Sequence, residues 1–303
     1  MTRRFPRSSA AMDEMMRASR PENIPAAILW MMGALACFVL MALAGRELSR
    51  AISTFEIVFF RAAIGLAILV PIIARLGWSR VKTQRFGFHC VRNTVHFAGQ
   101  WGWFHALGLI PLAEVFAIEF TSPIWTAILA AAFLGERITR LRVLAILLGF
   151  AGVLIVIRPG MTEFHAESLW ALGAALLYGV NFVVTRAMTR TEPALAIVFY
   201  MNVVQLPLAA AFTVPLWVTP PVHLWPWVFV VGAVGVVSHF CLARAFAQAE
   251  ATIVAPMDFL RLPFIAVAGY LLYQESIHPL VALGALVIVA GNWLNMRASR
   301  RAS

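Results

Sequence analysis

Two stretches of sequence decide the fold: residues 29–38, LWMMGALACF, and residues 169–178, LWALGAALLY. Each is uncharged and is apolar on every side of a helix, which predicts burial in lipid or within a helix bundle. They align at a separation of 140 residues, with Leu-Trp at the first two positions, Gly-Ala at the fifth and sixth, and an aromatic ring at the tenth. The sequence therefore predicts membrane-spanning helices arranged as a repeat.

The composition of the whole chain supports this interpretation. Of 303 residues, 61% are apolar and 13% are charged, whereas a soluble domain has about half and a quarter. A soluble enzyme, a disordered tail protein and a disulfide scaffold are excluded. A membrane-spanning helix needs about 20 apolar residues. We predict an all-α integral membrane protein with ten transmembrane helices, at about 26–44, 54–74, 86–108, 112–133, 143–157, 168–185, 194–217, 224–247, 251–273 and 279–296.

The basic residues fix the predicted orientation. The net charge of +10 comes from short basic loops between apolar runs, so it indicates membrane topology and no nucleic-acid partner. With ten spans and cytoplasmic termini, 17 of the 24 basic residues fall inside, whereas Arg46, Arg50 and Arg158 fall outside. We therefore expect a multi-pass protein of the bacterial inner membrane with both termini in the cytoplasm.

The repeat continues through both halves of the chain. Ile57-Val58-Phe59 recurs as Ile197-Val198-Phe199, and Ala151-Gly152 recurs as Ala290-Gly291. Each half holds five spans, an odd number, so the second half must be inverted. Inverted repeats are typical of carriers that work by alternating access. The predicted divisions are an N-terminal cytoplasmic tail (1–24), a first repeat (25–158), a second, inverted repeat (166–297) and a C-terminal cytoplasmic tail (298–303).

Several short motifs stand out: residues 106–113 (ALGLIPLA), 120–123 (FTSP), 134–137 (LGER) and 149–152 (GFAG), with weaker copies such as 260–263 (LRLP) in the second half. These motifs resemble those of EamA-type members of the drug/metabolite transporter superfamily. The resemblance implies ten helices in two five-helix repeats. Among such proteins the chain is most similar to bacterial aromatic amino-acid exporters. Others that share the region around Phe120-Thr121-Ser122-Pro123 move flavins or S-adenosylmethionine, so the substrate stays open.

Two acidic residues at membrane depth are the most informative polar groups. Glu119 and Asp258 lie 139 residues apart, and each is followed by Phe. Because the repeats are inverted, we expect Glu119 toward the periplasm and Asp258 toward the cytoplasm, one acid in each vestibule. Arg261 lies three residues after Asp258 and can pair with it on one helix face. We expect Arg61 to neutralise Glu119 and Arg244 to enter near the depth of Asp258; such pairs are often only architectural.

Other candidates follow from helical spacing. His96, Gln100 and Trp103 share one helix face, as do Tyr178 and Asn181, although ordinary core packing explains such patterns too. Prolines at matching positions of the two halves suggest helix breaks near the binding region. The candidate substrate-binding residues are Phe38, Gln100, Trp101, Glu119, Ser122, Tyr178, Asn181, His239 and Asp258; the candidate gating or ion-pair residues are Arg61, Arg244 and Arg261; the candidate hinges are Pro123 and Pro263. Tyr200, Asn202 and Gln205 are second-tier lining.

From these patterns we predict a carrier whose central, largely hydrophobic cavity is formed by the first, third, fourth, sixth, eighth and ninth spans. The resemblance favours export of aromatic and other apolar amino acids by alternating access. The alternative is import or exchange of a larger metabolite such as riboflavin or S-adenosylmethionine. The other class considered is a membrane-embedded enzyme that acts on lipids. It would need clustered catalytic acids or histidines at one interface, and the sequence shows no such cluster. We expect no cofactor and, without an HExxH motif, no metal site. One polypeptide carries the complete repeat pair, so we expect a monomer.

Overall fold

The computed structural model describes residues 22–109, 115, 118–136, 138–157, 166–261, 264 and 279–300. Every regular element in these ranges is a helix, as the sequence predicts. The longer helices are α2 (Ile24–Leu48), α3 (Thr54–Leu76), α4 (Phe86–Leu109), α6 (Ser122–Leu134), α7 (Arg140–Ile157), α8 (Ser168–Met188), α9 (Ala194–Thr213), α10 (Trp225–Gln248) and α13 (Pro279–Arg300). The short elements are the helix α11 (Ala251–Val254) and the 3-10 turns η1 (Trp78–Val81), η2 (Val214–Leu216), η3 (Val222–Leu224) and η4 (Ala255–Leu260). The predicted spans 112–133 and 251–273 are described only in part.

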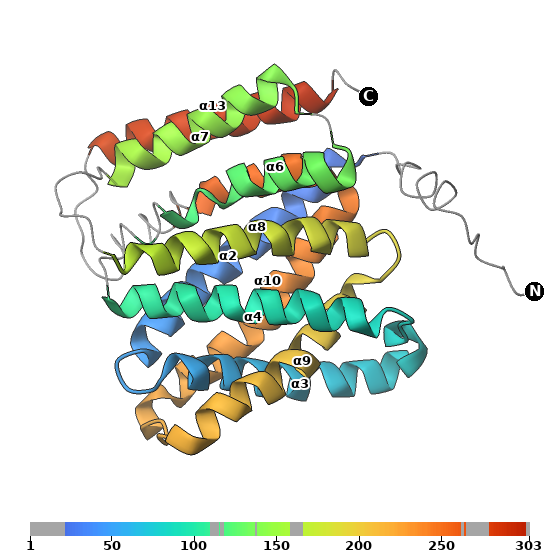
Figure 1. Cartoon of the computed structure of the whole chain (residues 1–303), viewed down its shortest axis with the longest axis vertical. Helices are drawn as coiled ribbons and strands as arrows, with labels where there is room; N and C mark the ends of the chain where they lie inside the picture. The colour runs from blue at the N-terminus through green and yellow to red at the C-terminus, as the bar shows by residue number, and fades with distance from the viewer. Residues whose placement is uncertain are drawn as a thin grey trace, which may run out of the picture.

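The helices pair reciprocally between the two halves. The first helix of the first half, α2, packs against α10, the third helix of the second half. In return, α4, the third helix of the first half, packs against α8, the first helix of the second. Likewise α3 packs against α9, and α7 packs against α13 as an outer pair (Figure 1). A two-fold relation between two copies of one unit produces this exchange of contacts.

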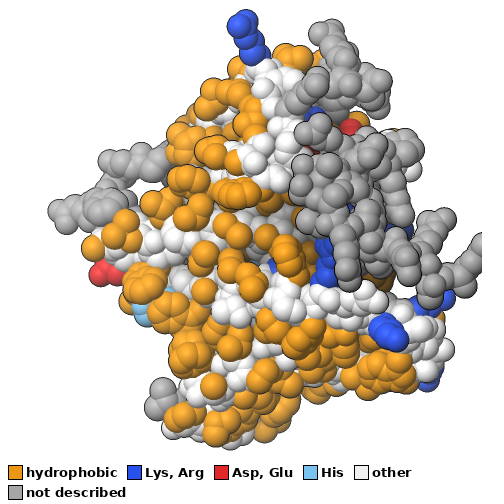
Figure 2. Space-filling view, turned by 45° about the vertical axis from the view of Figure 1, so that its right-hand side comes forward, with side chains coloured by type: hydrophobic (Ala, Val, Ile, Leu, Met, Phe, Trp, Pro, Cys, Tyr) orange, Lys and Arg blue, Asp and Glu red, His pale blue; other side chains and the backbone are white. Residues whose placement is uncertain are grey.

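The outer surface suits a hydrocarbon environment. Five segments are long and apolar enough to cross a membrane: α2, α3, α8, α9 and the run Val222–Gln248. Large apolar side chains point outward, including Leu29, which is 73% exposed, and Phe133, which is 70% exposed. Figure 2 shows hydrophobic side chains over much of one face, with few charged groups among them. Apolar surface on this scale is stable in contact with lipid.

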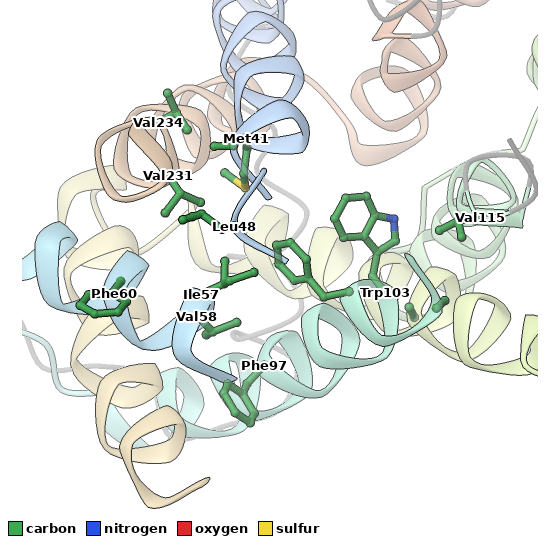
Figure 3. Close-up of a cluster of buried hydrophobic side chains, with 14 of the residues drawn as sticks. Met41, Leu48, Ile57, Val58, Phe60, Phe97, Trp103, Val115, Val231 and Val234 are labelled. Atoms are coloured by element: carbon green, nitrogen blue, oxygen red, sulfur yellow. The ribbon is translucent and has the colours of Figure 1, made fainter. Parts of the chain in front are cut away.

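Among the described residues, the largest hydrophobic cluster joins the two halves. It includes Met41 from α2, Ile57 from α3, Trp103 from α4, and Val231 and Val234 from α10. Figure 3 shows Met41 beside Val231 and Val234, with Ile57 directed toward the same region. The cluster fixes α2, α3, α4 and α10 relative to one another around the polar groups described below.

Glycine lets the outer pair approach closely. A Cβ atom on Gly152 of α7 would lie 2.7 Å from the Gly284 carbonyl oxygen of α13, and one on Gly291 would lie 2.9 Å from the Ala145 carbonyl oxygen. Both distances are shorter than van der Waals contact. The repeat partners Gly33 and Gly173 differ: Gly33 faces the Cys241 sulfur, whereas a Cβ atom on Gly173 would meet no described atom within 4 Å. Gly173 therefore makes no close packing contact with the residues that the structure describes.

Candidate functional site

A cavity of about 70 Å³ lies between the two halves. Its described lining comes from α2, α4, α8 and α10, from Glu119 just before α6, and from Asp258 and Arg261 at and after η4. These are the six spans that the sequence predicts around a central cavity. The described lining residues are Phe38, Met41, Ala42, His96, Gln100, Trp103, Phe104, Glu119, Tyr178, Phe182, His239, Leu242, Asp258 and Arg261.

One guanidinium joins the two buried acids. Arg261 Nη2 donates to Glu119 Oε1 at 2.5 Å and to Asp258 Oδ2 at 3.1 Å. The indole Nε1 of Trp103 donates to the other oxygen of Glu119 at 2.6 Å. The guanidinium also lies 5.7 Å from the ring centre of Phe38. Two carboxylates share one cation, so this acidic triad (Glu119, Asp258 and Arg261) has a formal excess of one negative charge at the cavity wall.

The triad confirms the predicted pairing of Asp258 with Arg261 but corrects two other expectations. Glu119 and Asp258 do not serve separate vestibules, because one side chain holds both. Glu119 pairs with Arg261 and not with Arg61. Depth along each span, counted from its end, placed the two acids far apart because it took both spans as continuous helices.

Both of those spans are broken at the triad. In the first half, Phe120 and Thr121 form a turn, and α6 begins only at Ser122. In the second half, α11 passes into the 3-10 turn η4 at Ala255. Pro123 lies in the first turn of α6, where a missing N–H costs nothing, so it marks a helix start and not a mid-helix kink. Pro263 lies outside the described residues. Discontinuous helices are where membrane carriers commonly bind substrate.

Two imidazoles meet on another wall of the cavity. The Nε2 atoms of His96 on α4 and His239 on α10 approach to 3.4 Å. His239 Nδ1 lies 2.9 Å from the Gly235 carbonyl oxygen, and its ring meets the Phe38 ring edge-on at 5.8 Å. Because α4 and α10 belong to different halves, this contact would change if the halves moved apart.

Behind Gln100 lies a second polar cluster. Arg61 Nη2 donates to Gln100 Oε1 at 2.9 Å and to Gln205 Oε1 at 2.5 Å. Gln205 Nε2 in turn contacts His96 Nδ1 at 3.1 Å. Gly235 makes room for this arginine, because a Cβ atom there would lie 2.8 Å from Arg61 Cγ. Arg61 thus supports the cavity wall from behind.

Two predicted site residues on the first-half helices are found in other places. Trp101 stacks on His105 at 4.8 Å and meets Trp170 edge-on. Ser122 is buried, and its carbonyl oxygen accepts a hydrogen bond from Thr126 Oγ1. Neither Trp101 nor Ser122 is among the described lining residues of the cavity.

Asn181 and Arg244 also lie outside that described lining. The Asn181 amide is buried and has no hydrogen-bond partner among the described residues. The Arg244 guanidinium lies 5.2 Å from the ring centre of Trp30. Neither residue contacts the acidic triad in the described contacts.

The sequence interpretation missed some of the wall. Met41, Phe104, Phe182 and Leu242 carry no chemical signal that separates them from other apolar residues of their spans. Trp103 differs, because its spacing from His96 and Gln100 already placed it on their face. The candidate list nevertheless named Trp101, whereas the structure places Trp103 in the lining.

A polar seam joins the halves beyond the triad. The Glu136 carboxylate accepts hydrogen bonds from the backbone N–H groups of Ala251 and Thr252, both at 3.0 Å. Arg142 forms a salt bridge with Glu250, and the Glu250 N–H donates to the Glu22 carboxylate at 3.1 Å. Burial raises the pKa of the Glu22 carboxyl. We call these residues together the Glu136 seam; its contacts cap the N-terminus of α11.

These features together define a class: a helical membrane protein with two related halves, broken helices and charged groups at a shared cavity. This is the architecture of a carrier. The model of the EamA-like transporter family matches the chain twice, over residues 25–158 and 165–297. The chain belongs to this family. It is a multi-pass membrane transporter with two repeats, and its substrate is a small molecule.

Named relatives differ in what they carry. The chain is 27% identical to an S-adenosylmethionine uptake transporter of Rickettsia bellii, covering 85% of this chain and 88% of the relative. It is 31% identical to a riboflavin transporter of Brucella anthropi, covering 80% and 87%. It is 29% identical to the pseudopaline exporter CntI of Pseudomonas aeruginosa, covering 81% and 87%.

The fold has also been seen in solved structures. One, described as "Crystal structure of protein", matches with a TM-score of 0.79 and 19% sequence identity. The match covers 93% of this chain and 100% of that one. At this identity the likeness concerns the fold alone.

Proposed function

We propose that the protein takes up or exchanges a ring-bearing metabolite of the S-adenosylmethionine and riboflavin class across the bacterial inner membrane. The observation that carries the proposal is the cavity between the halves, where aromatic rings and the acidic triad share one wall. Phe38, Trp103 and Tyr178 offer flat apolar surface to a ring system. The relatives' names favour this substrate class over the amino-acid export expected from the sequence.

The size of the cavity supports alternating access. A cavity of about 70 Å³ holds only a few water molecules. Ligands as large as S-adenosylmethionine or riboflavin occupy pockets of about 300–1,000 Å³. The halves must therefore separate to admit a substrate. The His96–His239 contact and the Glu136 seam both join one half to the other. Separation of the two halves therefore breaks these contacts.

Of the two relatives' substrates, S-adenosylmethionine fits the acidic triad better. Its ammonium and sulfonium groups are cations, and the triad carries one excess negative charge. Riboflavin is uncharged at neutral pH and gains nothing from that charge. We keep riboflavin as the second candidate because the aromatic wall suits its flat ring system.

Counterflow in proteoliposomes tests the proposal. Vesicles containing the purified chain are loaded with unlabelled S-adenosylmethionine, riboflavin, methionine or phenylalanine, and entry of the labelled form of each compound is measured. We expect accumulation of S-adenosylmethionine, or of riboflavin, and a large loss in the Asp258→Asn variant. Glu167→Gln, which changes an exposed carboxylate before α8, serves as the matched control. Accumulation of phenylalanine alone would refute the proposal and restore amino-acid transport.

A further inference from the structure

Two buried arginines near the cavity have no acidic partner in the part of the chain that the structure describes. Arg61 is 1% exposed and Arg92 is 2% exposed. Among the described residues neither forms a salt bridge. The described hydrogen bonds of Arg92 go to neutral groups, Thr185 Oγ1 at 2.9 Å and Asn93 Oδ1 at 2.6 Å. The Nε and Nη1 atoms of Arg61 have no hydrogen-bond partner among the residues that the structure describes.

The two guanidiniums belong to one cluster. Gln205 links them, because its carbonyl accepts from Arg61 and its amide reaches the Asn93 backbone oxygen at 3.5 Å. Their positive charges act on each other and on the rings of His96 and His239. An uncompensated buried charge costs several kcal/mol, and a like charge beside it adds to that cost. A compensating negative charge would therefore stabilise this arrangement.

The triad cannot supply that charge from its place in the structure. Both of its carboxylates are held by Arg261, and in the described contacts neither carboxylate reaches Arg61 or Arg92. The unpartnered buried atoms near Arg61 and Arg92 include several donors. Besides the two guanidinium nitrogens, the Asn93 Nδ2 atom, on a fully buried side chain, has no partner among the described residues.

We propose that Arg61, Arg92 and Asn93 form an anion-binding site beside the cavity. Convergent guanidinium and amide donors fit a small monovalent anion, either a carboxylate of the transported substrate or a free chloride ion. The carboxylate source rests on the proposed function, whereas the chloride source is independent of it. Gln100, which lines the cavity and accepts from Arg61, is the residue that a substrate carboxylate would displace.

The site gives the cavity two electrically opposite walls. Cationic groups of a substrate would face Glu119 and Asp258, and its anionic group would reach Arg61 by displacing Gln100 from the wall. A molecule that carries both charges on an amino-acid end gains from both walls. This arrangement selects an amino-acid-bearing substrate over an uncharged one of similar size.

Anion-dependent stability tests the site without any transported substrate. Thermal unfolding of the full chain in lipid nanodiscs is compared in sodium chloride, sodium acetate and the sodium salt of a bulky sulfonate buffer, at one ionic strength. Chloride or acetate should raise the melting temperature of the wild type by a few degrees, because ligands that bind only the folded state stabilise it. The shift should vanish in Arg61→Gln and Arg92→Gln.

Three further variants keep this result interpretable. Arg186→Gln is the matched control, because Arg186 donates to the Phe246 carbonyl away from the cluster; it should retain the shift. Asn93→Leu removes a donor without removing charge and should weaken the shift. This variant tests the site if a glutamine variant does not fold. Arg61→Lys keeps the positive charge and should retain part of the shift in melting temperature. A wild type that responds to neither anion, or a shift that persists in both glutamine variants, overturns the site.

A second comparison identifies the source of the anion. The affinity of the wild type for S-adenosylmethionine is compared with that for its decarboxylated analogue. A substrate source predicts about tenfold weaker binding of the analogue, the value of one charged hydrogen bond, and no difference in Arg61→Gln. Equal binding of the two by the wild type, with the chloride shift present, assigns the site to a free ion. Failure of S-adenosylmethionine to bind removes it as a substrate, and the chloride and acetate results still decide the site.

Discussion

Arg261 is the only cation of the acidic triad, so we expect the stability of the folded protein to depend on it. The Arg261→Gln substitution leaves Glu119 and Asp258 buried at one wall without their shared cation. The Asp258→Asn substitution, in contrast, leaves a balanced pair of Arg261 and Glu119. The two variants each change one charge, yet we expect very different costs.

The magnitudes follow from the contacts. Removal of one partner from a buried ion pair costs about 3–5 kcal/mol, because the remaining charge is uncompensated. For Arg261→Gln this corresponds to a melting temperature lower by roughly 10 °C. In the Asp258→Asn variant the new side-chain amide oxygen would still accept from Arg261, so we expect a loss of only about 1 kcal/mol.

The assay is thermal unfolding in nanodiscs with four variants. Arg75→Gln, at an exposed position in the last turn of α3, is the charge-matched control and should melt like the wild type. The neutral triple variant Glu119→Gln, Asp258→Asn, Arg261→Gln should regain most of the lost stability. If Arg261→Gln melts within about 2 °C of Asp258→Asn, the triad does not balance charge as described.

Three other predictions concern the periphery. Glu136→Gln weakens the caps on the Ala251 and Thr252 N–H groups and should cost about 1 kcal/mol; a cysteine at position 251 should then react faster with a water-soluble thiol reagent, and an unchanged rate would contradict the seam. Gly291→Leu should separate α7 from α13 and lower the melting temperature by several degrees, whereas Gly173→Leu, at an open position, should not. Because burial raises the pKa of Glu22, the stability that its protonated carboxyl contributes is fully present below the unfolded pKa and is lost as pH rises through the folded pKa. Glu22→Gln should therefore flatten the decline in melting temperature as pH rises above about 4.5, and an unaltered pH profile would count against a buried carboxyl.

Much of the fold could be predicted from the sequence because burial in lipid leaves a strong pattern. Long uncharged runs mark the helices, and the 140-residue repeat divides them into two related halves. Gln100 and His239 were both predicted as substrate-binding residues, and both line the cavity. The pattern Asp258-x-x-Arg261 predicted a pair three residues apart, and the pair is present.

The contacts across helices could not be predicted in the same way. Depth along a span depends on a continuous helix, and the breaks at Thr121 and Ala255 removed that assumption. Helical spacing gives the face of a residue but not the partner that the face meets, so Arg61 was paired with the wrong side chain. Its amide partner Gln205 lies 144 residues away, on a helix that no local pattern connects to α3.

Access to the cavity from both sides of the membrane tests the central claim most directly. Cysteine is introduced at Gln100 in a chain whose Cys37, Cys90 and Cys241 are replaced, and a membrane-impermeant thiol reagent is applied to right-side-out and inside-out vesicles. A carrier with a shared cavity predicts labelling from both sides and protection by transported substrate, with no labelling of a cysteine at the outward-facing Leu29. Labelling of position 100 from one side only, or from neither, would contradict alternating access through this cavity.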